Sequence, residues 1–277
     1  KGELGRFAPG LPKISDGQQL FVLNGLSKLA PNGKMAIIQN GSPLFSGDAG
    51  SGPSEIRKYI LENDWLDAIV QLPNNAFYNT SIATYIWIVV KNKPATHQGK
   101  VQLIDASACC SARRKNIGSK NVDITKACRD LIIEAYGAYA DDTYNGVDEN
   151  DNAIVVKSKV MDSIELGYNK IVVETPQLDD NGNVVTKNGK PVADATKRDT
   201  ENVPLAEDID AYFEREVIPY NPQAWIDKAK TKVGYEIPFT RAFYEYKQIE
   251  PSDVIAARIE EHEKSLMAKL HDLFGGE

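Results

Sequence analysis

Residues 66–91 have the sequence LDAIVQLPNNAFYNTSIATYIWIVVK, and this stretch decides the fold of the chain. Two runs within it, residues 68–72 and 83–90, are of strand length and rich in β-branched and aromatic residues. Both are too continuously apolar to leave one face in water, so they predict strands that are buried in a sheet. The polar loop between them then lies at one end of that sheet, and it carries Phe77, Tyr78, Asn79 and Thr80.

The adjacent aromatic residues of this loop have two interpretations. In the first, Phe77 and Tyr78 are plugs that close one end of the core, and spacing alone favours this role. In the second, the pair stacks on a planar ring while Asn79 and Thr80 hydrogen-bond the edge of that ring, which is how proteins hold a base that has left the nucleic-acid stack.

The residues before this stretch predict one unit of a doubly wound sheet. Apolar residues recur at helical intervals from residue 18 to residue 29, with Asp16 as the expected N-cap and Phe21 as an expected core residue. Residues 34–39, KMAIIQ, predict a short buried strand. Helix, tight turn and strand in this order are typical of α/β proteins.

A glycine-rich segment follows, at residues 46–52. It has neither the lysine nor the glycine spacing of a phosphate-binding loop, so we expect a mobile surface loop. Ser54 is the expected cap of a helix that leads into the strand at residues 68–72. After the second strand, residues 101–105 predict a further strand and residues 106–122 predict a loop.

The second half of the chain has weaker patterns. Asp123 or Thr125 is the expected cap of a helix over residues 126–139, and the acidic residues 141–151 predict a solvated linker, because their spacing does not match a calcium-binding loop. Asn-Gly pairs at residues 181–182 and 188–189 predict the tight turns of a hairpin.

A helix is predicted from Pro251 onward, with Ser252 as its cap. Apolar residues recur there in steps of three and four, which predicts a seam that covers the chain's own core or packs on another helix. The seam consists of Ile255, Ile259, His262, Leu266, Leu270 and Leu273.

Charge is divided unevenly between the two halves. The net charge of −7 over 277 residues argues against nucleic acid, but residues 1–125 hold 14 Lys and Arg against 9 Asp and Glu, whereas residues 126–277 hold 18 against 30. Contact with phosphate depends on local charge, so the basic half is able to face a DNA backbone. Arg113, Arg114 and Lys115 are candidate DNA contacts, although such a run is more often a solvated loop.

The cysteines and the hydropathy pattern restrict the class of protein further. No apolar run approaches the roughly 18–20 residues that a membrane span needs, and no signal-peptide pattern is present. Cys109, Cys110 and Cys128 form no spaced set of metal ligands. We therefore predict reduced thiols, a cytoplasmic protein and no metal site.

Five blocks of sequence carry a resemblance to a known family. They are NGKMAIIQNGSPLF (32–45), QLPNNAFYNTSIATYIWIVVKNK (71–93), GKVQLIDAS (99–107), SKVMDSIELGYNKIVVETP (158–176) and VGYEIPFTRAFYEY (233–246). Together they resemble the modification (methyltransferase) subunit of type I restriction–modification systems.

The resemblance implies a fold and a division of the chain. The fold class is α/β: the C-terminal half of a Rossmann-like sheet of an S-adenosylmethionine (AdoMet)-dependent methyltransferase, followed by an α+β region and a C-terminal helix. Residues 1–122 would belong to the catalytic domain, residues 123–250 to a mixed α/β extension and residues 251–277 to a helix for subunit packing.

The resemblance also implies an activity and roles for individual residues. The activity is transfer of the AdoMet methyl group to N6 of adenine in DNA. Phe77, with Tyr78 as the alternative, would stack on the target adenine, and Asn79 and Thr80 would shape the wall of its pocket. Phe21 would lie against the adenine of the cofactor. DNA, the specificity subunit and the restriction subunit are the implied partners.

The chain departs from the family pattern near its beginning. The family places a glycine-rich AdoMet-binding motif and a catalytic Asn-Pro-Pro-aromatic tetrapeptide before the segment GRFAPGLP (5–12), and neither motif is present in this sequence. We therefore expect a C-terminal fragment with no catalytic residue, an incomplete AdoMet site and no activity alone. Two alternatives stay open, a solitary adenine DNA methyltransferase and a non-catalytic assembly module that binds a specificity subunit.

Overall fold

A computed structural model describes residues 5–246 and 249–274. The chain divides into two compact units, Lys1–Phe243 and Tyr244–Glu277. The first unit contains two main sheets with their helices, and the second contains one long helix, α7 (Ser252–Phe274). No helix in the described part of the chain combines the length and the apolar character that a membrane crossing requires.

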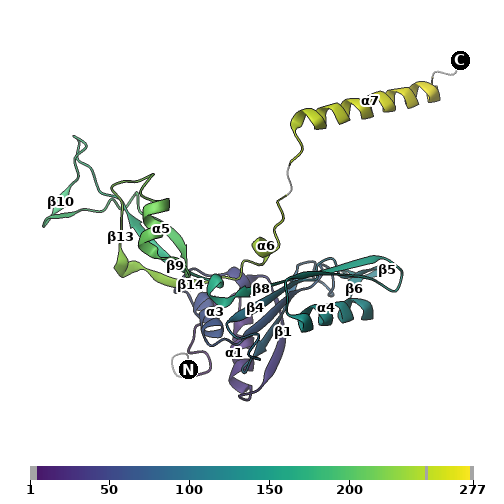
Figure 1. The fold of residues 1–277 in the computed structure, drawn as a ribbon, viewed down its shortest axis with the longest axis horizontal. Helices are drawn as coiled ribbons and strands as arrows, with labels where there is room; N and C mark the ends of the chain where they lie inside the picture. The colour runs from purple at the N-terminus through teal and green to yellow at the C-terminus, as the bar shows by residue number, and fades with distance from the viewer. Residues whose placement is uncertain (1–4, 247–248, 275–277) are drawn as a thin grey trace. The chain divides into compact units, whose positions relative to one another are not determined.

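Six strands form the first sheet, in the order β1-β3-β2-β4-β8-β7 (Figure 1). The strands are β1 (Lys34–Asn40), β2 (Leu66–Gln71), β3 (Thr84–Val90), β4 (Lys100–Asp105), β7 (Asp142–Val147) and β8 (Ala153–Asp162). The pair β2–β4 is parallel and the other four neighbouring pairs are antiparallel. The predicted α/β class and the two predicted strands within residues 66–91 are therefore confirmed, and these two strands pair antiparallel.

The strand β3 is covered on both faces. Its residues Tyr85, Trp87 and Val89 pack into a core with α1 (Gln18–Lys28) and α3 (Gly52–Glu62). Its alternate residues, Ile86 and Ile88, pack on the opposite face in a second core with α4 (Lys126–Ala138). Two covered faces explain why the sequence of this strand is almost continuously apolar.

The strand β1 differs from the prediction, because it is an edge strand and is not buried. Its side chains alternate between exposed and half-buried over most of its length, and Ile38 is 50 % exposed. Among the strands that the structure describes, β1 pairs with β3 alone, and the core around α4 lies over other strands. A short apolar run does not distinguish a central strand from an edge strand.

Of the four expected helix caps, those at Asp16 and Ser54 are wrong, and Ser252 is the first helical residue of α7. Gly17 occupies the N-cap position of α1, and the Asp16 carboxylate instead accepts hydrogen bonds from Gln18 Nε2 at 2.7 Å and from Ser42 Oγ. Ser54 lies inside α3, which begins at Gly52 with Pro53 in its first turn, a position that suits proline. Thr125 does cap α4, since its hydroxyl accepts from Cys128 N.

Two segments predicted as loop and linker form hairpins. Within residues 106–122 lies most of a hairpin of β5 (Ser111–Ile117) and β6 (Lys120–Asp123). The acidic segment at residues 141–151 forms β7 and the turn to β8, so the first sheet continues beyond residue 122, the end of the first predicted segment. The strands β5, β6 and β7 are largely polar and solvated, and such strands lack the apolar pattern by which a strand is recognised, whereas β8 buries Ile154 and Val156.

The second sheet is built around β9 (Gly167–Glu174), which pairs with β12 (Asp199–Pro204), β13 (Trp225–Ile226) and β14 (Lys232–Tyr235). The same part of the chain also contains two 3₁₀ turns, one helix and a separate two-stranded hairpin. These are Ser163–Leu166 and Lys228–Lys230, α5 (Ile209–Glu216), and β10 (Thr186–Lys187) with β11 (Lys190–Pro191). Asn188 and Gly189 form the turn of that hairpin with φ of 53° and 75°, as the Asn-Gly pair predicts.

A buried arginine joins the two sheets. Arg57 on α3 is 1 % exposed, and its guanidinium donates to the carbonyls of Pro43, Ser46 and Gly47 and to that of Tyr235 in β14. Burial lowers the pKa of Arg57 to about 10, so it stays charged at neutral pH. The glycine-rich segment after α2 (Ser42–Phe45) is thus held by this side chain, in contrast to the mobile loop that we predicted.

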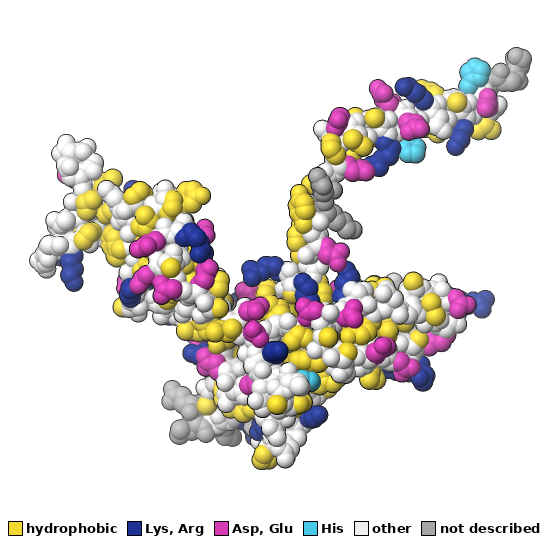
Figure 2. Space-filling model, in the orientation of Figure 1, with side chains coloured by type: hydrophobic (Ala, Val, Ile, Leu, Met, Phe, Trp, Pro, Cys, Tyr) yellow, Lys and Arg dark blue, Asp and Glu magenta, His cyan; other side chains and the backbone are white. Residues whose placement is uncertain are grey.

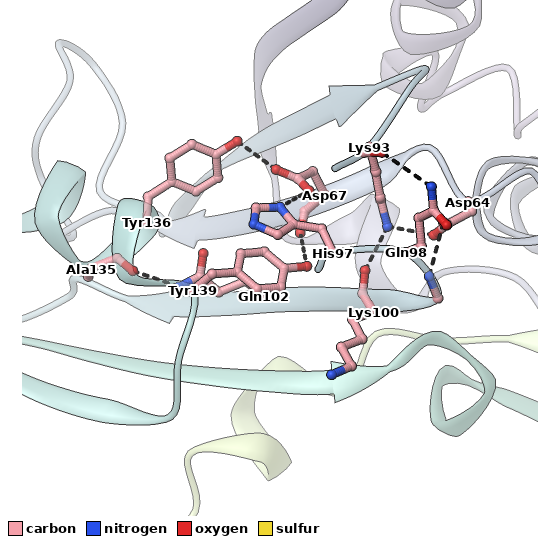
Figure 3. A network of polar contacts seen from close by, with 11 residues as sticks. Asp64, Asp67, Lys93, His97, Gln98, Lys100, Gln102, Ala135, Tyr136 and Tyr139 are labelled. Carbon is pink, nitrogen blue, oxygen red and sulfur yellow. Dashed lines mark hydrogen bonds and ion pairs between the residues drawn. The ribbon is translucent and has the colours of Figure 1, made fainter. Parts of the chain in front are cut away.

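A polar network fixes the sheet end at which β2 begins (Figure 3). The buried Asp67 carboxylate lies 2.9 Å from His97 Nδ1 and accepts a hydrogen bond from Tyr136 OH at 2.6 Å. The ring of His97 stacks on that of Tyr139 with 3.5 Å between centroids. Burial, reinforced by Asp67, raises the pKa of Tyr136. Because these groups satisfy one another, we assign the network to the attachment of α4 to β2.

Candidate nucleic-acid interface

The aromatic loop predicted from sequence connects β2 to β3 at the opposite end of the first sheet. Leu72 N donates to Thr84 O at 2.8 Å and closes the base of the loop. Asn75 and Asn79 both have φ of 57°, in the left-handed region that asparagine tolerates better than most residues. These two turns fix the direction of the short segment between them, which carries the aromatic pair.

The structure separates the two aromatic residues. Phe77 is half-buried and packs against the core that β2 and β4 share with α4. Tyr78 is 62 % exposed, Asn79 is exposed and Thr80 is half-buried. The plug interpretation therefore describes Phe77, whereas the ring that a ligand is able to reach is that of Tyr78.

The β5–β6 hairpin lies against this loop. Lys120 Nζ donates to Ala76 O at 2.7 Å, and Asn121 N donates to Asn75 O at 3.2 Å. At the hairpin turn, a Cβ added to Gly118 would lie 3.2 Å from Asn79 Oδ1, which shows how closely the two segments approach. These contacts have no signal in the sequence, because the hairpin residues that make them lie in what we predicted to be a loop.

The three predicted DNA contacts lie on β5 and are not equivalent. Arg113 pairs with Asp123 across the hairpin, with Nη1 to Oδ1 at 2.6 Å, and this hydrogen bond holds the pKa of Asp123 below its usual value. Arg114 and Lys115 are exposed. Figure 2 shows Lys and Arg side chains at the outer end of the hairpin, among Asp and Glu side chains. Two cations of the run are thus available for a phosphate.

A second group of polar residues lies at the end of β1. Gln18 Oε1 accepts from Asn40 N at 2.8 Å, and Asn40 Oδ1 accepts from Ser42 N at 2.9 Å. Hydrogen bonds from Ser42 and Gln18 lower the pKa of Asp16, so its carboxylate stays ionised at neutral pH. This network attaches the start of α1 to the turn after β1.

Phe21, the predicted cofactor contact, follows on α1. Its ring is 68 % exposed, so the expectation from pattern that Phe21 is ordinary core is wrong. An exposed aromatic ring is chemically suited to a nucleoside, because the ring is able to stack on a base. Phe21 thus fits the role that the resemblance implies.

A cavity of about 290 Å³ lies where the chain leaves the loop. Tyr85, the second residue of β3, lines it together with Phe45 and with Phe239 and Arg241 of α6 (Phe239–Ala242). The rings of Tyr85 and Phe239 meet edge to face with 5.4 Å between centroids. The sequence blocks at residues 32–45 and 233–246 both contribute to this cavity, although their spacing in the sequence does not predict that they meet.

The remaining predictions on sites concern metals and thiols. Among the described residues, no group of His, Cys, Asp and Glu side chains is arranged to hold a metal ion. The three cysteines are free thiols, and burial raises the pKa of Cys109 to about 12. Cys109 is therefore protonated and unreactive, as expected of a core thiol.

Comparison with known proteins identifies relatives of the chain. The N-6 DNA Methylase family matches residues 3–173. The type I restriction enzyme MjaIX methylase subunit of Methanocaldococcus jannaschii is 35 % identical over 109 residues, which are 39 % of this chain and 19 % of that protein. The HindI methylase subunit of Haemophilus influenzae is 34 % identical over 101 residues, which are 36 % of this chain and 22 % of that one.

Solved structures give matches of the same kind. The type I restriction-modification system methyltransferase subunit from Streptococcus thermophilus is 28 % identical, with a TM-score of 0.47 over 60 % of this chain and 31 % of that one. The matches to the two curated relatives span about a fifth of the length of those proteins.

Proposed function

Since the chain belongs to the N-6 DNA Methylase family, we propose that it is the C-terminal part of the methyltransferase subunit of a type I restriction–modification system. The intact subunit would transfer a methyl group from AdoMet to N6 of adenine in DNA. The proposal rests on the arrangement of the loop of residues 72–83. In this loop Phe77 packs on the core and Tyr78 is exposed, and the loop lies beside a hairpin with exposed cations.

Each part of this site has a task in the proposed reaction. N6 of adenine is not accessible for transfer while the base is stacked in a duplex, so the base must leave the helix. Tyr78 then stacks on the extruded adenine, and Phe77 supports the loop from beneath. Asn79 and Thr80 face the polar edge of the base. Arg114 and Lys115 contact the phosphates of the strand that carries it. We favour Tyr78 over Phe77 as the stacking ring because of its exposure.

The cofactor site of the intact subunit would include Phe21, as a platform for the adenine of AdoMet. When bound, AdoMet supplies the methyl group, and the residues of this chain position the acceptor. The glycine-rich motif and the Asn-Pro-Pro-aromatic motif of the family are not in this sequence. We therefore propose that the chain alone binds AdoMet weakly or not at all and is catalytically inactive.

The helix α7 supports an assembly role in the same complex. All six residues of its predicted seam lie within α7, and Ile259, Leu266, Leu270 and Leu273 are each more than two-fifths exposed. We propose that this seam packs on the specificity subunit of a complex that also contains the restriction subunit. The free thiols agree with an oxidation-protected, cytoplasmic location.

The test of the function is methylation in a living host. The gene that encodes the chain, in its full reading frame and with its neighbouring genes, is expressed in bacteria that lack adenine methylation. Single-molecule sequencing of host DNA then maps N6-methyladenine, so the recognition site need not be known. We expect one methylated motif, whose methylated fraction falls with Tyr78→Ala and is unchanged with Tyr220→Ala, a control at a tyrosine that is 88 % exposed. Absence of N6-methyladenine from a host that contains the assembled complex would refute the proposal.

A further inference from the structure

The β5–β6 hairpin has a feature that the proposed function does not explain, namely a lysine that is nearly buried. The Lys120 side chain is 14 % exposed, and its Nζ is divided between Asp123 at 3.1 Å and Ala76 O at 2.7 Å. A cation intended for phosphate is normally exposed, as Arg114 and Lys115 are. The ammonium group of Lys120 is thus paired within the protein, with the Asp123 carboxylate and with the backbone carbonyl of Ala76, which directly precedes Phe77.

The two carbonyls immediately before Phe77 both accept from this hairpin. Asn75 O accepts from the backbone N–H of Asn121, and Ala76 O accepts from Lys120. Asn75 itself is in the left-handed region, which costs free energy for any residue with a side chain. The hairpin therefore holds a turn whose backbone would otherwise relax, and this turn sets the direction of Phe77 and Tyr78.

The hairpin is itself fixed at its base. Ser111, the first residue of β5, donates from Oγ to Asp148 Oδ2 at 2.6 Å, and the two side chains are buried. Asp148 also accepts from Asn150 N and Asn152 N in the turn between β7 and β8. These hydrogen bonds, with that from Ser111 the strongest, hold the pKa of Asp148 far below its usual value.

We infer that the β5–β6 hairpin is a brace that fixes the distance between the phosphate-contacting cations and the base-stacking ring, and that Lys120 is its positioning residue. Lys120 acts through Ala76 and does not touch the base. The inference rests on the proposed function, because it assumes that Tyr78 stacks on an adenine. It adds that capture of the base depends on a residue of the hairpin that contacts neither base nor phosphate.

The test measures stacking and binding separately on the full chain. The probe is a single-stranded deoxyoligonucleotide with one 2-aminopurine among thymines, since an unpaired base needs no extrusion. Fluorescence anisotropy reports the Kd, and the quench of 2-aminopurine at saturating protein reports stacking. For Lys120→Met we expect the quench to fall to less than half, and for Lys120→Arg, which keeps a donor, we expect most of it to remain. Lys126→Met is the matched control, because Lys126 is exposed on α4 and pairs there with Asp130.

A residue that only stabilises the fold would give a different result. Lys120→Met would then lower the urea midpoint but leave the quench at saturation unchanged, and this outcome overturns the inference while base capture stands. The double variant Arg114→Ala, Lys115→Ala should differ from Lys120→Met in the opposite sense. Its binding should be weaker and less dependent on salt, while its quench at saturating protein should be unchanged. If the unaltered chain binds the probe without any quench, base capture by Tyr78 is itself wrong, and the inference fails with it.

Discussion

Phe77→Ala and Tyr78→Ala should affect different properties, although the two residues are adjacent. Tyr78 is 62 % exposed, so its truncation removes little buried surface and should change the free energy of unfolding by about 0.5 kcal/mol or less. Stacking of a base on an aromatic ring contributes roughly 1 to 3 kcal/mol. Tyr78→Ala should therefore weaken binding of an accessible adenine by roughly 5- to 150-fold, at about 1.4 kcal/mol for each factor of ten.

Phe77 should show the opposite pattern. Its ring packs against the core that includes Val70, Leu72 and Ile104. Truncation of a fully buried phenylalanine costs about 3 to 5 kcal/mol, and for a half-buried ring we expect about 2 kcal/mol. Phe77→Leu keeps most of the apolar contact and should cost less than about 1.5 kcal/mol. The leucine variant should also retain adenine binding, because in this structure Phe77 supports the loop from the core side.

Two assays separate the residues. Urea denaturation followed by tryptophan fluorescence gives the free energy of unfolding. Binding to two single-stranded oligonucleotides, one with a central adenine and one with an abasic site there, isolates the contribution of the base. The reasoning is refuted if Phe77→Leu abolishes the preference for adenine at unchanged stability while Tyr78→Ala keeps it. Phe77 would then be the stacking ring, as the sequence resemblance implied.

Three further predictions follow from the contacts. Arg57→Met leaves up to four carbonyls without their donor and should cost about 3 kcal/mol or more in urea unfolding, whereas Lys58→Met on the same helix should cost under about 0.5 kcal/mol. Burial opposes ionisation of Glu174, but hydrogen bonds from Lys230 and Arg198 outweigh it and lower the pKa of Glu174, so stability should fall as pH decreases below about 4.5. That decrease, measured by urea midpoints between pH 6 and pH 3, should be smaller in Glu174→Gln. Leu266→Asp combined with Leu270→Asp should abolish co-purification with the specificity subunit, while Ala268→Asp, off the seam, should not; retention by the double variant would exclude the seam as the interface.

A strand is recognisable from its sequence when neighbouring strands and helices bury it on both edges and both faces. β2 and β3 lie inside the sheet with both faces covered, and their sequence is recognisable because every side chain is under the same constraint. β1 has a similar composition but lies at an edge, and composition does not report the number of neighbours. β5, β6 and β7 are polar strands whose pairing depends on partners distant in sequence, such as Ser111 with Asp148.

The candidate site shows the same limit more sharply. The adjacent aromatic residues were recognisable from sequence. Which of them packs on the core and which is exposed depends on the left-handed backbone of Asn75 and Asn79. Sequence also placed Phe21 in the core, because a ring on an amphipathic helix normally is, although the structure leaves it 68 % exposed. Conversely, Lys120 was not recognisable at all, since nothing in a polar segment distinguishes a lysine that holds a carbonyl from one in solvent.

The same contacts show why counting cations does not locate a DNA surface. Arg113 and Lys120 both pair with Asp123, so two of the four basic residues of the hairpin are committed to internal partners. Arg114 and Lys115 are exposed and keep their charge available. Each phosphate contact changes the slope of log K against log salt concentration by about 0.7 to 0.9. The hairpin should therefore contribute a slope near that of two contacts, about 1.4 for a single strand. A slope change near twice that value on removal of all four basic residues of the hairpin would mean that Arg113 and Lys120 leave Asp123 when DNA binds.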